Sequence, residues 1–149
     1  MDIKNAIPKK NLWKCNLWEL IISRQNILLA YKKVKSNKGV AGIDGMKVEG
    51  FIRYFNTNGK KLLERLEHLT YQPQPTLRYK LPKPNSDKFR MISVPTVKDR
   101  VIQQAISQII TPLLDKTFSN NSYAYRPGKS THDALLKVRH FVNEGKFLH

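Results

Sequence analysis

Residues 76–95, TLRYKLPKPNSDKFRMISVP, differ in period from the rest of this sequence. Apolar residues alternate with basic ones over residues 77–81, the period of two typical of a β-strand. PNSDK has the composition of a turn, and residues 89–94 read as a second strand. The sequence therefore predicts one antiparallel β-hairpin, with three cations at or near its tip: Lys83, Lys88 and Arg90.

Before this stretch the apolar residues recur at helical spacing. Residues 11–39 read as helix, with Ser23 as an internal N-cap that divides it in two and Gly39 as the C′ residue. Residues 37–45, NKGVAGIDG, hold three glycines and predict a loop with many accessible backbone N–H groups. Residues 49–75 predict two short helices, the second with an apolar face of four leucines: Leu62, Leu63, Leu66 and Leu69.

Two more helices are predicted after the hairpin. The first starts at residues 96–99, which resemble a capping box with Asp99 in place of the usual Glu, and Pro112 kinks it or begins a new turn. Residues 118–128 read as loop, and Ser130 or Thr131 caps the last helix. The predicted fold class is α+β, mostly helical with one basic antiparallel hairpin.

Charge is the strongest guide to function. The chain has 27 Lys and Arg residues against 11 Asp and Glu residues, a formal net charge of +16. Such an excess repels itself unless it meets a polyanion. The basic residues lie in loops and in the hairpin rather than along one amphipathic helix, which favours nucleic acid over a membrane surface. Lysines that protect an edge strand from aggregation would explain one or two of these cations, not all.

Several kinds of catalytic site are not predicted. Gly128-Lys129-Ser130 resembles the end of a P-loop, but the required first glycine is replaced by Tyr123. The sequence has no G-x-S-x-G motif, no adjacent or alternating pair of acidic residues and no zinc-like His spacing. The single cysteine, Cys15, reads as a core residue in a reducing compartment. Without a long apolar run or a secretory signal, the expected location is cytoplasmic.

Three stretches in this order resemble the group II intron-encoded reverse transcriptases, or maturases. They are ILLAYKKVKSNKGVAGIDG, YQPQPTLRYKLPKPNSDKFRMISVPTVKDRVIQQAISQIITPLLD and SYAYRPGKSTHDAL. The resemblance runs from about Leu17 to Leu136 and covers the family's RT0 segment and its first two reverse-transcriptase blocks. It implies an N-terminal helical extension at residues 1–36, and the fingers with the start of the palm at residues 37–149.

The resemblance also implies site residues. In the family, a Lys and an Arg of the hairpin contact the triphosphate of the incoming deoxynucleotide, and the matching positions are Lys83 and Arg90. The glycine-rich loop is similar to one that covers the template strand. The implied nucleic-acid-binding residues are Lys38, Gly39, Gly42, Arg78, Lys80, Lys88, Arg100, Tyr125 and Arg126.

The sequence departs from the family's pattern at the hairpin and in the following loop. The turn PNSDK replaces P-N-G and adds Asp87, and Met91 stands where the family has proline. Ala124 and Tyr125 replace the Gly and Phe of S-Y-G-F-R-P-G. These changes bear on the geometry of the hairpin tip.

The resemblance implies RNA-directed DNA synthesis and assistance to intron splicing by the parent enzyme. The expected partners are intron and template RNA, a DNA primer and a deoxynucleoside triphosphate, without a membrane. Because the family's catalytic aspartates would follow His149, we expect a fragment that has no catalytic or metal site of its own and is inactive alone. Mg²⁺ would act in the full-length enzyme. The alternative is a non-catalytic RNA-binding module that assists intron folding and splicing.

Overall fold

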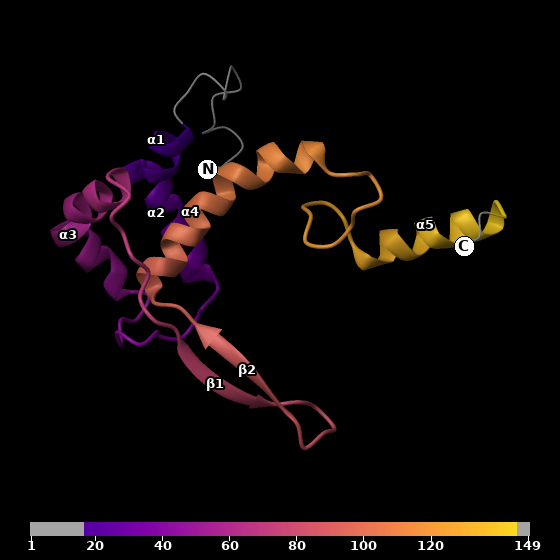
Figure 1. The fold of residues 1–149 in the computed structure, drawn as a ribbon, viewed down its shortest axis with the longest axis horizontal. Coiled ribbons are helices and arrows are strands. Elements are labelled where there is room, and N and C mark those ends of the chain that lie inside the picture. Colours follow the sequence, from indigo (N-terminus) through magenta and orange to yellow (C-terminus); the bar gives the residue numbers. More distant parts are fainter. Residues whose placement is uncertain (1–16, 146–149) are drawn as a thin grey trace. The chain divides into compact units, whose positions relative to one another are not determined.

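The computed structural model describes residues 17–145. Its elements are α1 (Leu17–Ile22), α2 (Arg24–Ser36), α3 (Gly50–Glu67), β1 (Leu77–Pro82), β2 (Phe89–Val94), α4 (Val97–Leu114), a 3₁₀ turn η2 (Asp115–Thr117) and α5 (Thr131–Asn143) (Figure 1). Helices with one two-stranded antiparallel sheet confirm the α+β class. The chain divides into two compact units between Ile109 and Ile110, whereas the predicted boundary at residue 36 stays a prediction. Cys15 lies outside the described residues.

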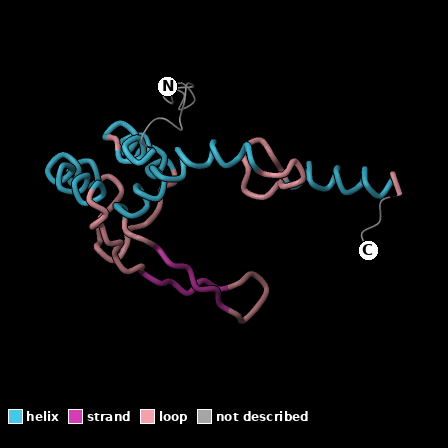
Figure 2. The backbone as a smooth tube through the Cα atoms, turned by 45° about the horizontal axis from the view of Figure 1, so that its top comes forward, coloured by secondary structure: helices cyan, strands magenta, loops and turns pink. Residues whose placement is uncertain are grey.

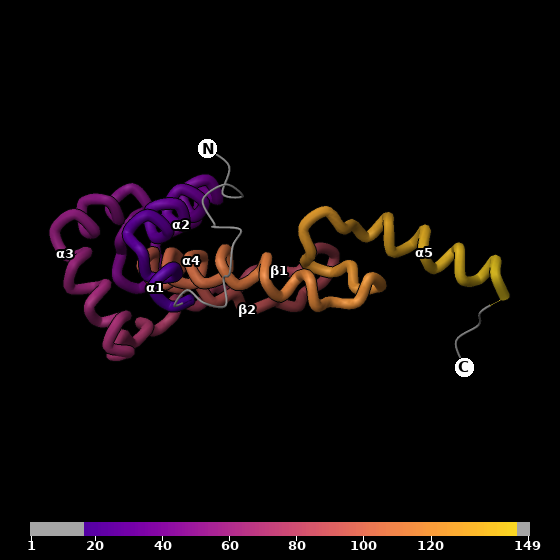
Figure 3. The backbone as a smooth tube through the Cα atoms, turned by 90° about the horizontal axis from the view of Figure 1, so that it is seen from above, coloured from indigo at the N-terminus to yellow at the C-terminus, as the bar shows by residue number. Residues whose placement is uncertain are grey.

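The first unit is built on a core shared by α2, α3 and the first turns of α4 (Figure 3). At its centre Phe51 stacks between Tyr31 and Phe55, with ring centroids 5.3 and 5.6 Å apart. The predicted apolar face of α4 packs here through Val101 and Ala105, both fully buried. Burying a large apolar side chain contributes roughly 1.5–3 kcal/mol, so this cluster holds the three helices together.

A buried polar pair fixes α2 against α4. Ser23 caps α2 as predicted, by accepting from the backbone N–H of Asn26. The Asn26 amide donates to the carbonyl of Ala105 at 3.0 Å and accepts from Gln108 Nε2 at 2.5 Å. Because unpaired buried amides are costly, these bonds favour one alignment of the two helices.

The prediction of two helices over residues 49–75 was wrong, because α3 is one helix of 18 residues that runs through Gly59. A Cβ at Gly59 would lie 3.1 Å from the ring of Phe55. The glycine therefore lets that ring lie flat on its own helix. Leu62 and Leu66 are buried as predicted, but Leu69 follows the helix with φ of 56° and is 77% exposed.

The hairpin extends from this helical base as an arm (Figure 1). Leu77 pairs with Val94, Tyr79 with Ile92 and Leu81 with Arg90. Figure 2 shows the two strands twisting about each other. Leu77 and Val94, which pair at its base, are partly buried, and every other residue of the two strands is exposed. Both faces of the hairpin are therefore exposed.

The second unit holds the end of α4, which continues through Pro112, and α5. The predicted cap of α5 is confirmed as Ser130, in a reciprocal capping box with Asp133. These hydrogen bonds hold the pKa of Asp133 below its usual range. No α5 residue is buried, and several apolar side chains of this helix are exposed. Among the described residues, no helix is long and apolar enough to cross a membrane.

Candidate nucleic-acid interface

The pleat of the hairpin separates its cations between two faces. Cross-strand partners share a face and successive residues alternate. The N–H of Lys83 donates to the carbonyl of Lys88 at 2.9 Å, which carries the register one pair beyond the strands. Lys83, Lys88 and Arg90 therefore share one face near the tip, while Arg78 and Lys80 lie on the other. All five residues are exposed.

The tip is a turn of residues 84–87 closed by that hydrogen bond. Asn85 adopts φ of 56°, a left-handed conformation that asparagine tolerates better than most residues. Ser86 Oγ accepts from the N–H of Lys88. PNSDK therefore forms a closed turn although it lacks the glycine that is usual in the family.

The glycine-rich loop is fastened to the start of α4. Lys38, not Gly39, takes the left-handed conformation after α2, with φ of 48°. Arg100 Nη2 donates to the carbonyl of Val40 at 2.5 Å. Lys98 Nζ lies 3.5 Å from a carboxylate oxygen of Asp44. The loop is thus held at both ends of its glycine-rich part.

Gly42 brings the backbone of this loop close to the backbone of residues 95–96. A Cβ there would lie 2.7 Å from Thr96 Cα and 2.9 Å from the carbonyl oxygen of Pro95. Both are backbone atoms, so only glycine lets the loop lie directly against the segment between β2 and α4. At Gly39, a Cβ would instead meet the guanidinium of Arg100.

Arg100 therefore organises the loop. Its Nε is buried without a hydrogen-bond partner among the described residues. The side chain borders a hollow of about 330 Å³ that Asn37, Gln103 and Gln104 also line. Among the described residues no ion pair joins Arg100 to the adjacent Asp99, whose carboxylate binds Tyr71 and Thr96 instead.

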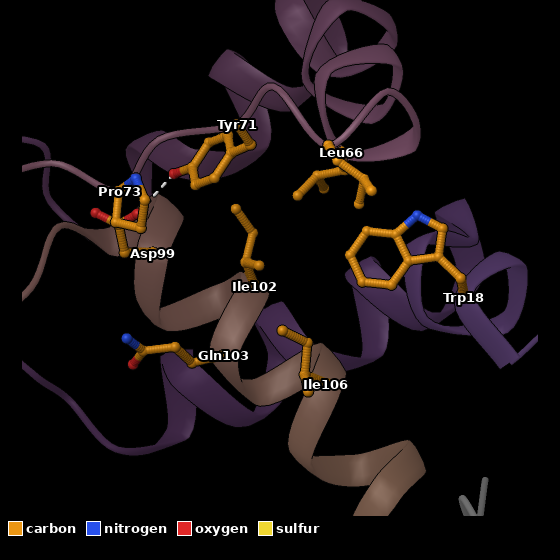
Figure 4. Close-up of a pocket in the computed structure, with 9 residues that line it drawn as sticks. Trp18, Leu66, Tyr71, Pro73, Asp99, Ile102, Gln103 and Ile106 are labelled. Carbon is orange, nitrogen blue, oxygen red and sulfur yellow. Dashed lines mark hydrogen bonds between the residues drawn. The ribbon is translucent and has the colours of Figure 1, made fainter.

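Asp99 fastens the other side of this junction, to the segment that enters the hairpin. Its buried carboxylate accepts from Tyr71 Oη at 2.6 Å, Thr96 Oγ1 at 2.6 Å and the N–H of Gln74 at 3.2 Å. Figure 4 shows Tyr71 reaching Asp99. Burial and this carboxylate raise the pKa of Tyr71 far above its usual range, so the phenol stays protonated.

One half of the predicted capping box is confirmed, since the N–H of Asp99 donates to Thr96 Oγ1 at 3.2 Å. The Asp99 carboxylate accepts from the Thr96 hydroxyl rather than from its backbone N–H. Its bonds to Tyr71 and Gln74 come from residues 25 or more positions away and were not predicted. An apolar cavity of about 270 Å³ lies beside this cluster, lined in part by Leu66, Ile102 and Ile106 (Figure 4). Residues 95–100 thus fasten both the glycine-rich loop and the hairpin.

In the second unit, Tyr125 and Arg126 are adjacent in sequence but differ in environment. Tyr125 has φ of 56° and is fully exposed. The Arg126 guanidinium binds Asp115 Oδ1 at 2.7 Å and the carbonyls of Asp115 and Ser119 at 2.9 and 2.7 Å. This pairing holds the pKa of Asp115 below its usual range. Arg126 therefore holds the loop closed, and its predicted contact with nucleic acid stays a prediction.

A metal site is not formed by these side chains. Within residues 17–145, no group of three or more His, Cys, Asp or Glu side chains could hold a metal ion. The Mg²⁺ that the resemblance implies for the full-length enzyme therefore has no ligand group of this kind within these residues.

Comparison with known proteins agrees with these features. Residues 81–146 match the reverse transcriptase (RNA-dependent DNA polymerase) family. Group II intron-encoded protein LtrA of Lactococcus lactis subsp. cremoris is 32% identical over 125 residues, 83% of this chain and 20% of LtrA. Protein YkfC of Escherichia coli (strain K12) is 30% identical over 125 residues, 83% of this chain and 32% of YkfC.

A putative COX1/OXI3 intron 2 protein of Saccharomyces cerevisiae is 27% identical over 143 residues, 94% of this chain and 16% of the yeast protein. The chain thus spans a third or less of the length of each of these relatives. The match nevertheless covers the hairpin, the glycine-rich loop and the junction that joins them. The chain is thus homologous to group II intron-encoded proteins over most of its length, and residues 81–146 match the reverse transcriptase family.

Proposed function

We propose that this chain is the RNA-binding fingers part of a group II intron reverse transcriptase and maturase, and that its hairpin contacts the incoming deoxynucleotide in the complete enzyme. The observation that carries the proposal is the exposed cationic face of the hairpin, Lys83, Lys88 and Arg90. The family relationship and the net charge of +16 support the choice of partner.

The hairpin face suits a triphosphate. Lys83 and Arg90 share a face, so a point charge and a planar guanidinium can approach the same group of phosphate oxygens. Positively charged groups held there would oppose the negative charge that develops during nucleotidyl transfer. The rigid turn and the ladder bond at Lys83 keep the two side chains in register.

The glycine-rich loop suits a nucleic acid strand. Arg100, Lys98 and Gly42 hold it against the junction. Its path is therefore fixed before a ligand arrives, which lowers the entropic cost of binding. In this proposal the exposed cations, Lys38 of the loop and Arg78 and Lys80 of the second hairpin face, contact template or intron RNA.

The two hairpin faces offer a matched experiment. Lys83→Ala/Arg90→Ala and Arg78→Ala/Lys80→Ala each remove one lysine and one arginine from the same arm. In a full-length enzyme that contains this chain, the first pair is expected to raise the apparent KM for dNTP at least tenfold more than the second. Equal effects of the two pairs would refute a specific triphosphate contact.

A non-catalytic RNA-binding role is the second candidate, favoured by the exposed basic surface of the chain itself. Purified chain supplied with Mg²⁺, primer, template and dNTPs is expected to bind RNA without extending the primer. Sustained extension would overturn the proposal that catalysis requires the complete enzyme.

A further inference from the structure

A polar hollow lies between α3 and the segment that leads to the hairpin. Its volume is about 220 Å³. One wall is a ridge of α3 residues spaced four, three and four apart, Tyr54, Asn58, Lys61 and Arg65. This spacing places them on one side of the helix, next to the buried Leu62, which also lines the hollow.

The opposite wall is the segment that leads to the hairpin. Backbone N–H groups of Thr70 and Tyr71 donate to the carbonyl of Arg65 at 2.9 and 3.1 Å, which folds this segment back along the helix. Gln72 and Gln74 then line the hollow together with Tyr71. The bonds of Tyr71 and Gln74 to Asp99 hold this wall in place.

The hollow is positively charged. Lys98 lines it, but this lysine is paired with Asp44 and lies over the ring of Tyr54. Lys61 and Arg65 have no carboxylate within 4.0 Å among the described residues. The protonated phenol of Tyr71 adds no negative charge. Two cations and several amide groups therefore converge on one small concave site.

We propose that this hollow binds one backbone phosphate of an RNA strand, with Lys61 and Arg65 as the charged contacts. The site is smaller than the roughly 300–1,000 Å³ typical of pockets that enclose a whole small molecule. It therefore suits one phosphate of a chain that continues over the surface. Amide donors beside a guanidinium and an ammonium are the groups that most often contact phosphate oxygens.

This site rests on the proposed RNA-binding function and adds a second point of contact away from the hairpin. A strand held at α3 and at the hairpin face would be fixed in direction, as well as in position. The predicted site residues, which lie on the hairpin, the two loops and the start of α4, do not include this surface.

The test uses the neighbouring lysines of α3. Lys61→Gln and Arg65→Gln remove cations from the hollow, whereas Lys60→Gln removes the same charge from a side chain that is 93% exposed and faces Glu64. Binding of a fluorescein-labelled single-stranded RNA of about ten nucleotides is measured by anisotropy at several salt concentrations. Circular dichroism verifies that all variants fold.

Lys61→Gln/Arg65→Gln is expected to weaken binding about tenfold or more and to lower the magnitude of the salt slope by about 0.7, the contribution of one phosphate of a single strand. Lys60→Gln is expected to change affinity less than about threefold. Nuclear magnetic resonance should show the side-chain amides of Asn58, Gln72 and Gln74 shifting with RNA.

If the wild-type chain binds RNA but the double variant binds it with the same affinity as Lys60→Gln, the site is overturned and the proposed function still stands. The site would also be overturned if the side-chain amide resonances of Asn58, Gln72 and Gln74 did not shift when RNA is added. Failure of the wild-type chain to bind RNA at all would overturn both.

Discussion

Removal of the Asp99 carboxylate should loosen the base of the hairpin and destabilise the first unit. In Asp99→Ala, Tyr71 Oη, Thr96 Oγ1 and the N–H of Gln74 lose their acceptor. A hydrogen bond to a charged group contributes about 1.5–3 kcal/mol, so three bonds set an upper bound of roughly 5–9 kcal/mol. Desolvation of the buried carboxylate opposes this by several kcal/mol. We expect the free energy of unfolding to fall by about 2–4 kcal/mol.

Such a loss is a large part of the roughly 5–15 kcal/mol that stabilises a domain. Urea unfolding followed by circular dichroism measures it, with Asp87→Ala in the exposed hairpin turn as a control expected to change stability by less than about 0.5 kcal/mol. Tyr71→Phe should remove one bond and about 1–2 kcal/mol. A loss below about 1 kcal/mol for Asp99→Ala would refute the role of this carboxylate in fastening the hairpin.

Three further predictions concern the loops and the pH dependence. Gly42→Ala should destabilise by about 1–3 kcal/mol in urea unfolding, because its Cβ meets the backbone of Thr96; unchanged stability would contradict the close approach. Arg126 holds the pKa of Asp115 below its usual range, so their pairing stabilises the loop at neutral pH and is lost as the pH falls below about 4. An Arg126 Nε–H resonance in the nuclear magnetic resonance spectrum that does not change through that pH range would argue against this pairing. Because the pKa of Tyr71 is raised in the folded chain, the free energy of unfolding should decline above about pH 10. The decline should be smaller in Tyr71→Phe, and an equal decline in the wild type and this variant would exclude Tyr71 as its cause.

Local patterns in the sequence were enough to predict much of the fold. The hairpin at residues 76–95, the caps at Ser23 and Ser130 and the apolar face of α4 all depend on neighbours within a few residues, and all are confirmed. The two helices predicted over residues 49–75 are one helix, which runs through Gly59 although glycine is unfavourable inside helices. The packing of Gly59 against Phe55 is visible only in the folded helix.

Long-range polar contacts could not be predicted. Gln108 and Asn26 are 82 residues apart, and neither residue type by itself signals burial. Asp99 was predicted as a cap because Thr96 lies three residues before it, but its bond to Tyr71 depends on how the chain returns from α3. Arg126 was placed at a nucleic-acid surface by the family resemblance, while the structure gives it a role in closing its own loop.

The predicted site residues fall into two groups. Lys83, Lys88 and Arg90 are brought together by the register of the hairpin, which alternation along the sequence already indicated. Arg100 and Gly42 meet only because the glycine-rich loop folds onto the junction at residues 95–100. The spacing of Tyr54, Asn58, Lys61 and Arg65 was a signal for a shared helix face, but the prediction of two helices in this region concealed it.

The salt dependence of RNA binding tests the central claim most directly. The affinity of the 149-residue chain for single-stranded RNA should fall linearly on a plot of log K against log salt concentration. A slope of about −0.7 per phosphate contacted predicts about −3 or steeper if four or more cations of this surface bind the strand. Absence of binding, or an affinity that does not change with salt, would contradict the proposal that the basic surface of this chain binds RNA.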